Sequence, residues 1–178
     1  VVGAKLREGA KYIKSPTYKV SISSKNKWFK VKNGILLSKD GKTVYGPASA
    51  RKDIVIPQGA KTIVHDAFNR LCNLATTQYN SIYIPSTVNA IKRGSLSANA
   101  GTTIKISKKN KRYGLSGDCL YSKKTGRLVA MMNRNDTLIV PRNVTNITNN
   151  YSIIGDRFEN IIIPSTVTKL EVSSLCYI

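Results

Sequence analysis

Basic side chains gathered around aromatic residues give this sequence its clearest chemical capacity. One group surrounds Trp28 and Phe29, and a second group surrounds Tyr113 and continues beyond it. The chain carries 29 lysines and arginines against 9 acidic residues, a formal net charge of +20, and such a field attracts polyanions. The sequence therefore predicts an anionic macromolecular partner, bound by Lys25, Lys27, Lys30, Lys32, Lys108, Lys109, Lys111, Arg112, Lys123, Lys124 and Arg127.

The same residues also fit a purely solubilising role. Lysines on exposed strands discourage edge-to-edge pairing between molecules. Net charge bears on both association and solubility, so it leaves the two interpretations open. The aromatic residues have two interpretations as well, since they could stack on a sugar or a base. We interpret Trp28, Phe29 and Tyr113 as apolar anchors of the linker strands.

The sequence offers few side chains that could catalyse a reaction. His65 is the only histidine, so any histidine-assisted reaction would have to use it. Asp66 could orient its imidazole, and Cys72 could supply a nucleophile. We pair His65 with Lys92 of the following repeat, and a repeat position that accepts either residue is typical of an exposed or structural side chain. The sequence thus predicts a protein that is not an enzyme and has no catalytic residues.

The sequence also offers no ligand set for a metal or a cofactor. Cys72, Cys119 and Cys176 form no CxxC pair and stand beside no histidine cluster, so no zinc site is expected. An odd number of cysteines cannot pair fully within one chain, and we interpret them as small buried hydrophobes. Gly114 and Gly117 lack the strand-to-helix context of a phosphate-binding loop. No apolar run approaches the ~18 residues of a membrane helix, so no transmembrane segment is expected.

The elements that must position these residues are short strands that end in a proline. Each unit has three β-formers, a proline, a polar turn, and apolar residues three and six places after the proline. The first unit is Ile54-Val55-Ile56-Pro57, and the others end at Pro85, Pro141 and Pro164. Proline cannot donate to a ladder and therefore marks a strand end. A repeat of 20 to 30 residues predicts a mainly β solenoid, in which stacking buries the apolar faces.

A larger repeat contains these units. Residues 20–31 align with residues 104–115 at an offset of 84, and Pro57 and Pro141 keep that offset. Each copy has a strand, a basic linker, a hairpin and two proline-marked strands; the leading strands are 20–22 and 104–106. In the first hairpin, 35–37 pairs with 43–45 through a turn whose Asp40-Gly41 predicts type I′ geometry. In the second hairpin, the turn at 123–126 fits a bulge containing glycine.

We therefore expect one repeat domain over residues 1–178. The first super-unit covers 20–103 and the second, shorter one covers 104–178. Residues 1–19 are a truncated repeat or an N-terminal cap. Because the chain begins without methionine at Val1, we expect it to be a fragment of a longer parent, with any secretion signal or anchor upstream.

These repeats resemble the BspA-type leucine-rich-repeat proteins, which are bacterial, mostly surface-exposed and also found in some protists. The resemblance rests on the four proline units, on Ile63 to Phe68 followed by Cys72, and on the two hairpins. Ser95-Leu96 and Ser174-Leu175 depart from the family's alanine-phenylalanine step and imply irregular coils. The resemblance implies a right-handed leucine-rich-repeat solenoid with hairpin inserts and little helix.

For function, the resemblance implies a cell-surface or secreted module that binds or adheres without catalysis. The expected partner is a host matrix protein or an acidic glycan, and the family carries over no binding residues. The alternative from the charge is a basic nucleic-acid-binding repeat protein.

Overall fold

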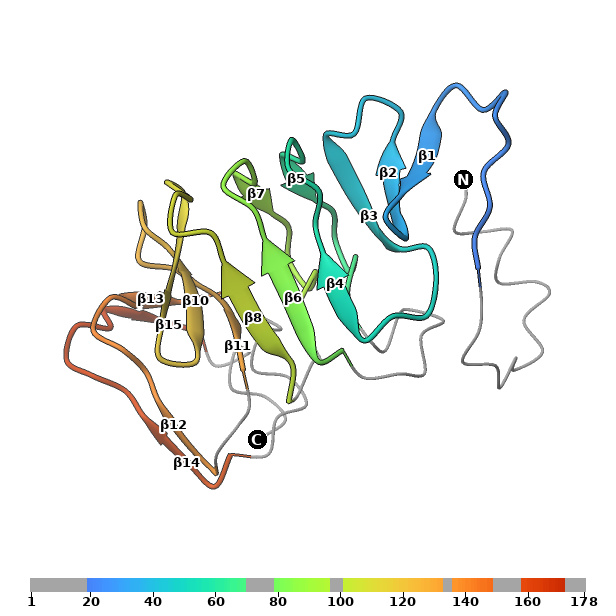
Figure 1. Ribbon diagram of the computed structural model, residues 1–178. Coiled ribbons are helices and arrows are strands. Elements are labelled where there is room, and N and C mark those ends of the chain that lie inside the picture. The colour runs from blue at the N-terminus through green and yellow to red at the C-terminus, as the bar shows by residue number, and fades with distance from the viewer. Residues whose placement is uncertain (1–18, 70–78, 97–100, 133–135, 149–157, 172–178) are drawn as a thin grey trace.

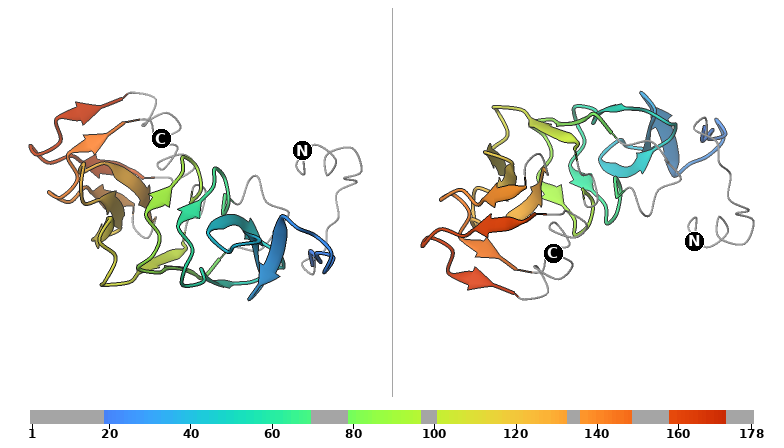
Figure 2. Two further views of the ribbon diagram at one scale, coloured as in Figure 1. Left: turned by 90° about the horizontal axis from the view of Figure 1, so that it is seen from above. Right: turned by 90° about the horizontal axis from the view of Figure 1, so that it is seen from below.

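The computed structural model describes residues 19–69, 79–96, 101–132, 136–148 and 158–171, and every statement below concerns these residues. Their regular structure consists of short strands, and they contain no helix, as expected of a mainly β chain. The cap expected over residues 1–19, apart from Lys19, lies outside the described residues, as do Cys72 and Cys176. Figures 1 and 2 show the strands following one another along the molecule in sequence order.

Successive proline units pair in parallel. Strands β4 (Asp53–Val55), β6 (Ser81–Ile84) and β8 (Thr103–Ile106) form one three-stranded sheet. Its register places Ile54 beside Ile82 and Ile82 beside Ile104. The short strands β5 (Thr62–Ile63) and β7 (Ala90–Ile91) continue a second sheet in the same direction. The 28 residues between Pro57 and Pro85 are therefore the spacing between β4 and β6, whereas β8, which no proline follows, lies 22 residues after β6.

The C-terminal units repeat this arrangement in two smaller sheets. Strand β12 (Thr137–Ile139) pairs in parallel with β14 (Asn160–Ile162). Strand β13 (Asn146–Ile147) pairs in parallel with β15 (Lys169–Leu170). Ile162 is 54% exposed and Leu170 is 46% exposed, so this last unit buries less of its apolar surface than the units before it.

The turn after each proline is the same in all four units. The proline carbonyl accepts a hydrogen bond from the N–H three residues later, with N···O distances of 3.2, 3.3, 2.9 and 3.1 Å in chain order; the donors are Ala60, Val88, Val144 and Val167. The first three donors are also core residues, each at most 1% exposed. The polar turn with an apolar anchor three places after the proline is therefore confirmed.

Two antiparallel sheets interrupt the parallel ladders. Strands β1 (Phe29–Lys32), β2 (Ile35–Ser38) and β3 (Thr43–Pro47) form the first. Strands β9 (Tyr113–Ser116), β10 (Cys119–Ser122) and β11 (Leu128–Met131) form the second. The two expected hairpins are confirmed, and the end of each basic linker adds a third strand. Strand β3 also pairs with β5, which joins the first hairpin to the parallel ladder.

The type I′ turn was expected at the wrong place. Positive φ at two successive residues occurs at Asn33 (51°) and Gly34 (71°), between β1 and β2. In the Asp40-Gly41 turn only Gly41 has positive φ, at 79°. The Asp40 carboxylate accepts hydrogen bonds from the Ser38 hydroxyl (2.6 Å) and the Lys42 N–H (3.0 Å), which fold the loop around the side chain. These two bonds, Ser38 first, also lower the pKa of Asp40. The glycine expected in the second turn is found at Gly126, with φ 63°.

The leading strand expected at residues 20–22 does not form, although its counterpart is β8. Strand β8 has β6 beside it as a parallel partner. The earlier segment makes only an antiparallel bridge from Lys19 to Ser49 and a bond from the Val20 N–H to the Ala48 carbonyl. Without a neighbouring strand among the described residues, it lacks the ladder that fixes β8.

The core consists of two apolar clusters that follow the ladders. In the larger one, Ile54 and Ile82 are 0% exposed and Ile104 is 2% exposed. The smaller cluster gathers Cys119, Leu128, Leu138 and Ile147. Burying a side chain of this size contributes about 1.5–3 kcal/mol relative to leaving it in water. Stacking of like residues from successive units therefore stabilises the ladders.

Candidate functional site

An asparagine fixes the first basic linker. The side-chain oxygen of Asn26 accepts hydrogen bonds from the N–H groups of Trp28 and Phe29, both at 2.8 Å. The ammonium of Lys39, at the end of β2, donates to the Asn26 carbonyl at 2.8 Å. The linker is thus tied to its own hairpin from both sides.

The second linker is held by the same three hydrogen bonds 84 residues later, and we call this set of bonds the brace. The side-chain oxygen of Asn110 accepts from the N–H groups of Arg112 (2.9 Å) and Tyr113 (2.8 Å). The Lys123 ammonium donates to the Asn110 carbonyl at 2.7 Å. Lys123 was predicted to bind a partner; its ammonium holds the linker, and its part in binding stays a prediction. Its counterpart Lys39, absent from the expected site residues, has the same role.

The other predicted site residues lie where the sequence placed them, on the two linkers and hairpins. Two of them, Lys30 and Arg127, are half-buried; the remainder are exposed, namely Lys25, Lys27, Lys32, Lys108, Lys109, Lys111, Arg112 and Lys124. Lys30 and Lys32 line a small hollow together with Asp40 and Pro57, and the ion pair of Asp40 is with Lys42 at 3.7 Å. Exposure is compatible both with partner binding and with solubility.

The three linker aromatics differ in their surroundings. Tyr113 is 5% exposed, and its hydroxyl accepts a hydrogen bond from the Ile91 N–H at 2.9 Å. Phe29 is half-buried and packs edge-on against Tyr45, with ring centroids 5.3 Å apart. Both are therefore anchors, as expected. Trp28 is 75% exposed, so its interpretation as an anchor was wrong. The Asn26 bonds hold the Trp28 backbone while leaving its ring in solvent.

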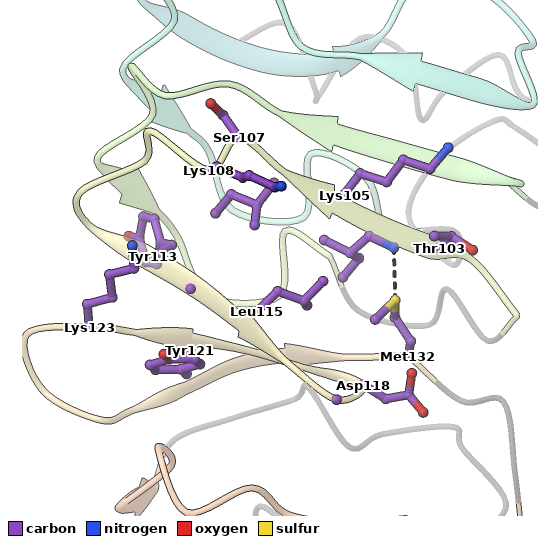
Figure 3. Close-up of a pocket in the computed structure, with 14 residues that line it drawn as sticks. Thr103, Lys105, Ser107, Lys108, Tyr113, Leu115, Asp118, Tyr121, Lys123 and Met132 are labelled. Atoms are coloured by element: carbon purple, nitrogen blue, oxygen red, sulfur yellow. Dashed lines mark hydrogen bonds between the residues drawn. The ribbon is translucent and has the colours of Figure 1, made fainter.

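A groove of about 670 Å³ lies between β8 and β9 (Figure 3). Strand β8 forms one wall, from which Lys105 extends, and Leu115 of β9 lies on the other. Lys108 and Lys123 line the end near the linker, and Asp118 and Met132 line the opposite end. The sequence prediction missed Lys105, Leu115 and the groove itself. The volume is in the range of small-ligand and peptide sites.

One glycine helps to shape this groove. A Cβ atom on Gly114 would lie 2.8 Å from the ring of Tyr121, so the ring packs directly over the β9 backbone. The Tyr121 hydroxyl accepts a hydrogen bond from the Asn143 side-chain amide at 3.1 Å. In the first hairpin the corresponding residues are Lys30 and Leu37, a long side chain facing a shorter one. Comparing the repeats at these two positions would have shown the exchange.

The only histidine forms a surface pair. The His65 Nδ1 atom lies 2.5 Å from a carboxylate oxygen of Asp66, and the histidine side chain is 60% exposed. The other Asp66 oxygen accepts from the Asn69 side chain at 3.2 Å. The register of Ile63 with Ile91 aligns His65 with Arg93, so the pairing with Lys92 was wrong by one residue. The proposed nucleophile Cys72 lies outside the described residues.

The remaining reactive groups have structural surroundings. Cys119 is 0% exposed, and burial, followed by the charge of Asp118, raises the pKa of its thiol to about 12. This agrees with its interpretation as a small hydrophobe. Within the described ranges, no three His, Cys, Asp or Glu side chains are grouped as metal ligands. None of the described segments forms a helix long and apolar enough to cross a membrane.

Known proteins resemble this chain in structure and not in overall sequence. No family model matches the sequence, and no curated protein matches it. A leucine-rich-repeat protein from Eubacterium ventriosum superposes with a TM-score of 0.55 at 25% identity, over 66% of this chain and 31% of that one. The chain shares its fold with a leucine-rich-repeat protein. This confirms the leucine-rich-repeat part of the resemblance seen in the sequence.

A second solved structure is more distant. It is a leucine-rich cell-surface protein from Faecalibacterium prausnitzii, with a TM-score of 0.45 at 14% identity, over 82% of this chain and 45% of that one. This chain spans 31% of the first solved structure and 45% of the second, less than half of either.

Proposed function

We propose that this leucine-rich-repeat chain is a non-catalytic binding module, secreted or displayed at a cell surface, whose two basic linkers recognise an anionic macromolecule. The parallel proline units are successive coils of a right-handed solenoid of the BspA type, and residues 1–178 form one repeat domain. Residues 20–103 and 104–178 are its two super-units. The partner is an acidic glycan or a host matrix protein.

The observation that carries this proposal is the repeated Asn–Lys brace. A lysine on a loose loop loses side-chain and backbone entropy when it binds, whereas a lysine on a braced loop has already lost part of it. The same three hydrogen bonds fix both linkers, 84 residues apart, and leave Lys25, Lys27, Lys108 and Lys109 exposed. A solubilising charge needs no such brace, because it acts equally well from a loose loop.

The test compares two variants of equal net charge. In one, Lys25, Lys27, Lys108 and Lys109 become glutamate; in the control, the exposed Lys52, Lys61, Lys92 and Lys169 become glutamate. Binding to a sulfated glycosaminoglycan and to a matrix protein is measured over a salt series. The linker variant is expected to bind at least roughly tenfold more weakly than the control. Equal loss in both variants would show that only net charge matters.

The exposed Trp28 favours nucleic acid as a second candidate partner. Its ring is free to stack on a base beside Lys27. It is also the only tryptophan, so its fluorescence reports directly on the first linker. Single-stranded DNA that quenches Trp28 fluorescence, with affinity falling steeply as salt rises, would support this candidate. Quenching by the glycan and not by DNA would support the first.

A further inference from the structure

We propose that the groove between β8 and β9 binds an extended acidic peptide, which adds to the sheet as a strand along β8. The proposal rests on the proposed binding function and names one partner chemistry and one site for it. The groove shares Lys108 with the second linker, so the two proposals are separated by the linker lysines outside the groove, namely Lys25, Lys27 and Lys109.

The open edges of two strands line this groove. Among the described residues, β8 is the outer strand of the β4-β6-β8 sheet, and β9 is the outer strand of the β11-β10-β9 sheet. The Thr103 N–H donates to the carbonyl of Asn80, just before β6, at 2.8 Å, and the Ser107 N–H donates to the Ile84 carbonyl of β6 at 2.9 Å. Because backbone groups alternate along a strand, those of Ile104 and Ile106 point the other way, into the groove. An open strand edge is a template for pairing with another chain.

A weak acceptor occupies part of this edge. The Ile104 N–H donates to the sulfur of Met132 at 3.0 Å, as the dashed line in Figure 3 shows. A thioether sulfur is a poor acceptor compared with a peptide carbonyl. Met132 is an unbranched, adaptable side chain, so it can yield its place to an incoming strand. The edge is therefore covered without being paired.

The side chains of β8 define the pattern of the peptide. Ile104 is buried and Ile106 is half-buried on one face of the strand, whereas Lys105 extends from the other. Side chains beside one another on adjacent strands interact, and opposite charges are favourable there. A strand added to β8 would place apolar residues beside the isoleucines and Leu115, and acidic residues beside Lys105 and Lys108. Asp118 lies at the far end and would repel an acid there.

The groove should distinguish a peptide from an acidic glycan through backbone hydrogen bonds. The groove offers backbone donors and acceptors at strand spacing, which match a peptide backbone and not a sugar ring. The aromatic face that a sugar would need is limited, because Tyr113 is only 5% exposed and one face of the Tyr121 ring packs over Gly114.

The test uses the full chain and three probes: a blocked hexapeptide of alternating valine and glutamate, the same peptide with every amide N-methylated, and a sulfated hexasaccharide. The peptide is expected to shift the Ile104 and Ile106 amide resonances and protect them from hydrogen exchange. N-methylation is expected to weaken binding at least roughly tenfold, because two or more backbone bonds are lost. Equal binding of both peptides, or shifts at these amides with the hexasaccharide alone, would overturn the proposal.

A charge-reversal variant provides a second test of the groove, which does not depend on the hydrogen bonds of the peptide backbone. Lys105→Glu should weaken binding of the glutamate peptide roughly tenfold and strengthen binding of a valine–lysine peptide, because the attraction is reversed. Lys92→Glu is the matched control, since Lys92 is exposed and lies outside the groove. If both variants respond alike, the groove is not the site.

The two proposals remain distinguishable in this design. Glycan or matrix-protein binding that depends on the linker lysines, together with silent groove amides, would overturn the peptide site and leave the proposed function intact. Peptide binding at the groove amides, together with glycan and matrix-protein binding that does not depend on Lys25, Lys27 and Lys109, would do the reverse.

Discussion

The two linker–hairpin regions, residues 20–47 and 104–131, share one brace and differ in what surrounds it. Asn26 and Asn110 hold their linkers with the same two side-chain bonds, and Lys39 and Lys123 close each brace from the hairpin. Among the described residues, the second region has a ladder strand ahead of its linker and a groove beside it, whereas residues 20–22 of the first region form no strand. The brace is therefore a scaffold that can carry different surfaces.

A pair of exchanged side chains accompanies the difference. In the first hairpin Lys30 lies opposite Leu37, and in the second Gly114 lies opposite Tyr121. The Tyr121 ring packs over the bare Gly114 backbone, and both residues line the groove. The first region instead directs Lys30 and Lys32 toward a hollow of about 110 Å³. Variants that affect one region and not the other test whether the two linker–hairpin regions differ in this way.

The largest contrast is expected from the brace asparagines. Asn110 is 1% exposed, and its amide also donates to the Pro85 and Val88 carbonyls at 2.9 and 3.0 Å. Asn110→Ala should cost about 2–4 kcal/mol of unfolding free energy, because it leaves several buried groups unpaired. Asn26→Ala should cost about 1 kcal/mol. Urea unfolding followed by circular dichroism measures both, and equal losses would contradict the contrast.

The glycine–tyrosine pair should show strong coupling. Gly114→Ala forces the Tyr121 ring to move and should cost about 1–3 kcal/mol. In a Tyr121→Leu background, which copies Leu37 of the first hairpin, the same change should cost little. A double-mutant cycle by thermal unfolding measures the coupling, with Lys30→Ala as the control at the corresponding position. Additive effects would mean that the ring does not depend on the glycine.

The buried thiol of the second hairpin should be inert in the folded chain. Cys119 stands where the first hairpin has Ile35, and burial raises its pKa to about 12. In a Cys72→Ser, Cys176→Ser background, its reaction with a disulfide reagent at pH 8 should be at least roughly tenfold slower than in urea. Rapid labelling of the folded chain would contradict its burial.

The raised pKa of the Cys119 thiol also affects the stability of the folded chain at high pH. Because the folded pKa lies above the unfolded value of about 8.5, the contribution of the neutral thiol is complete below that pH and is lost as the pH rises toward 12. The wild-type chain should therefore lose stability relative to Cys119→Val over this window. If the free energy of unfolding changes with pH in the same way in both proteins, the raised pKa of Cys119 would be contradicted.

The smallest effect, and an equal one in both regions, is expected from the brace lysines. Lys39→Met and Lys123→Met each remove one hydrogen bond to an asparagine carbonyl while keeping the apolar stem. Each should cost about 0.5–1.5 kcal/mol. A clear difference between the two, measured by urea unfolding, would show that the braces are not equivalent.

The sequence was most informative where one residue type has one structural consequence. Strands β4, β6, β12 and β14 each end within two residues of the proline that was expected to end them, because its missing donor acts locally. The hairpins were also predictable from their β-formers and glycines. The turn type was not, since Asn33-Gly34 and Asp40-Gly41 offer the same signal, and the Asp40 side chain decides between them by bonding Ser38 and Lys42.

Features that depend on distant partners were missed. The sequence shows lysine–asparagine–lysine twice, but only the folded chain shows that Asn110 reaches Pro85 and that Lys123 reaches Asn110. Trp28 was misplaced because an aromatic residue next to a half-buried one need not share its face. The groove requires both the pairing of β8 with β6 and the separation of β9 from β8, which no local pattern encodes.

The central claim is that the linkers bind because they are braced, and not only because they are basic. Asn26→Ala tests this most directly, because it loosens the first linker and leaves the net charge at +20. Trp28 fluorescence, titrated with a sulfated glycosaminoglycan, measures binding at that linker. We expect the affinity to fall roughly threefold to tenfold, as the loop must then be ordered on binding. An unchanged affinity would show that charge alone attracts the partner and that the brace has no part in binding.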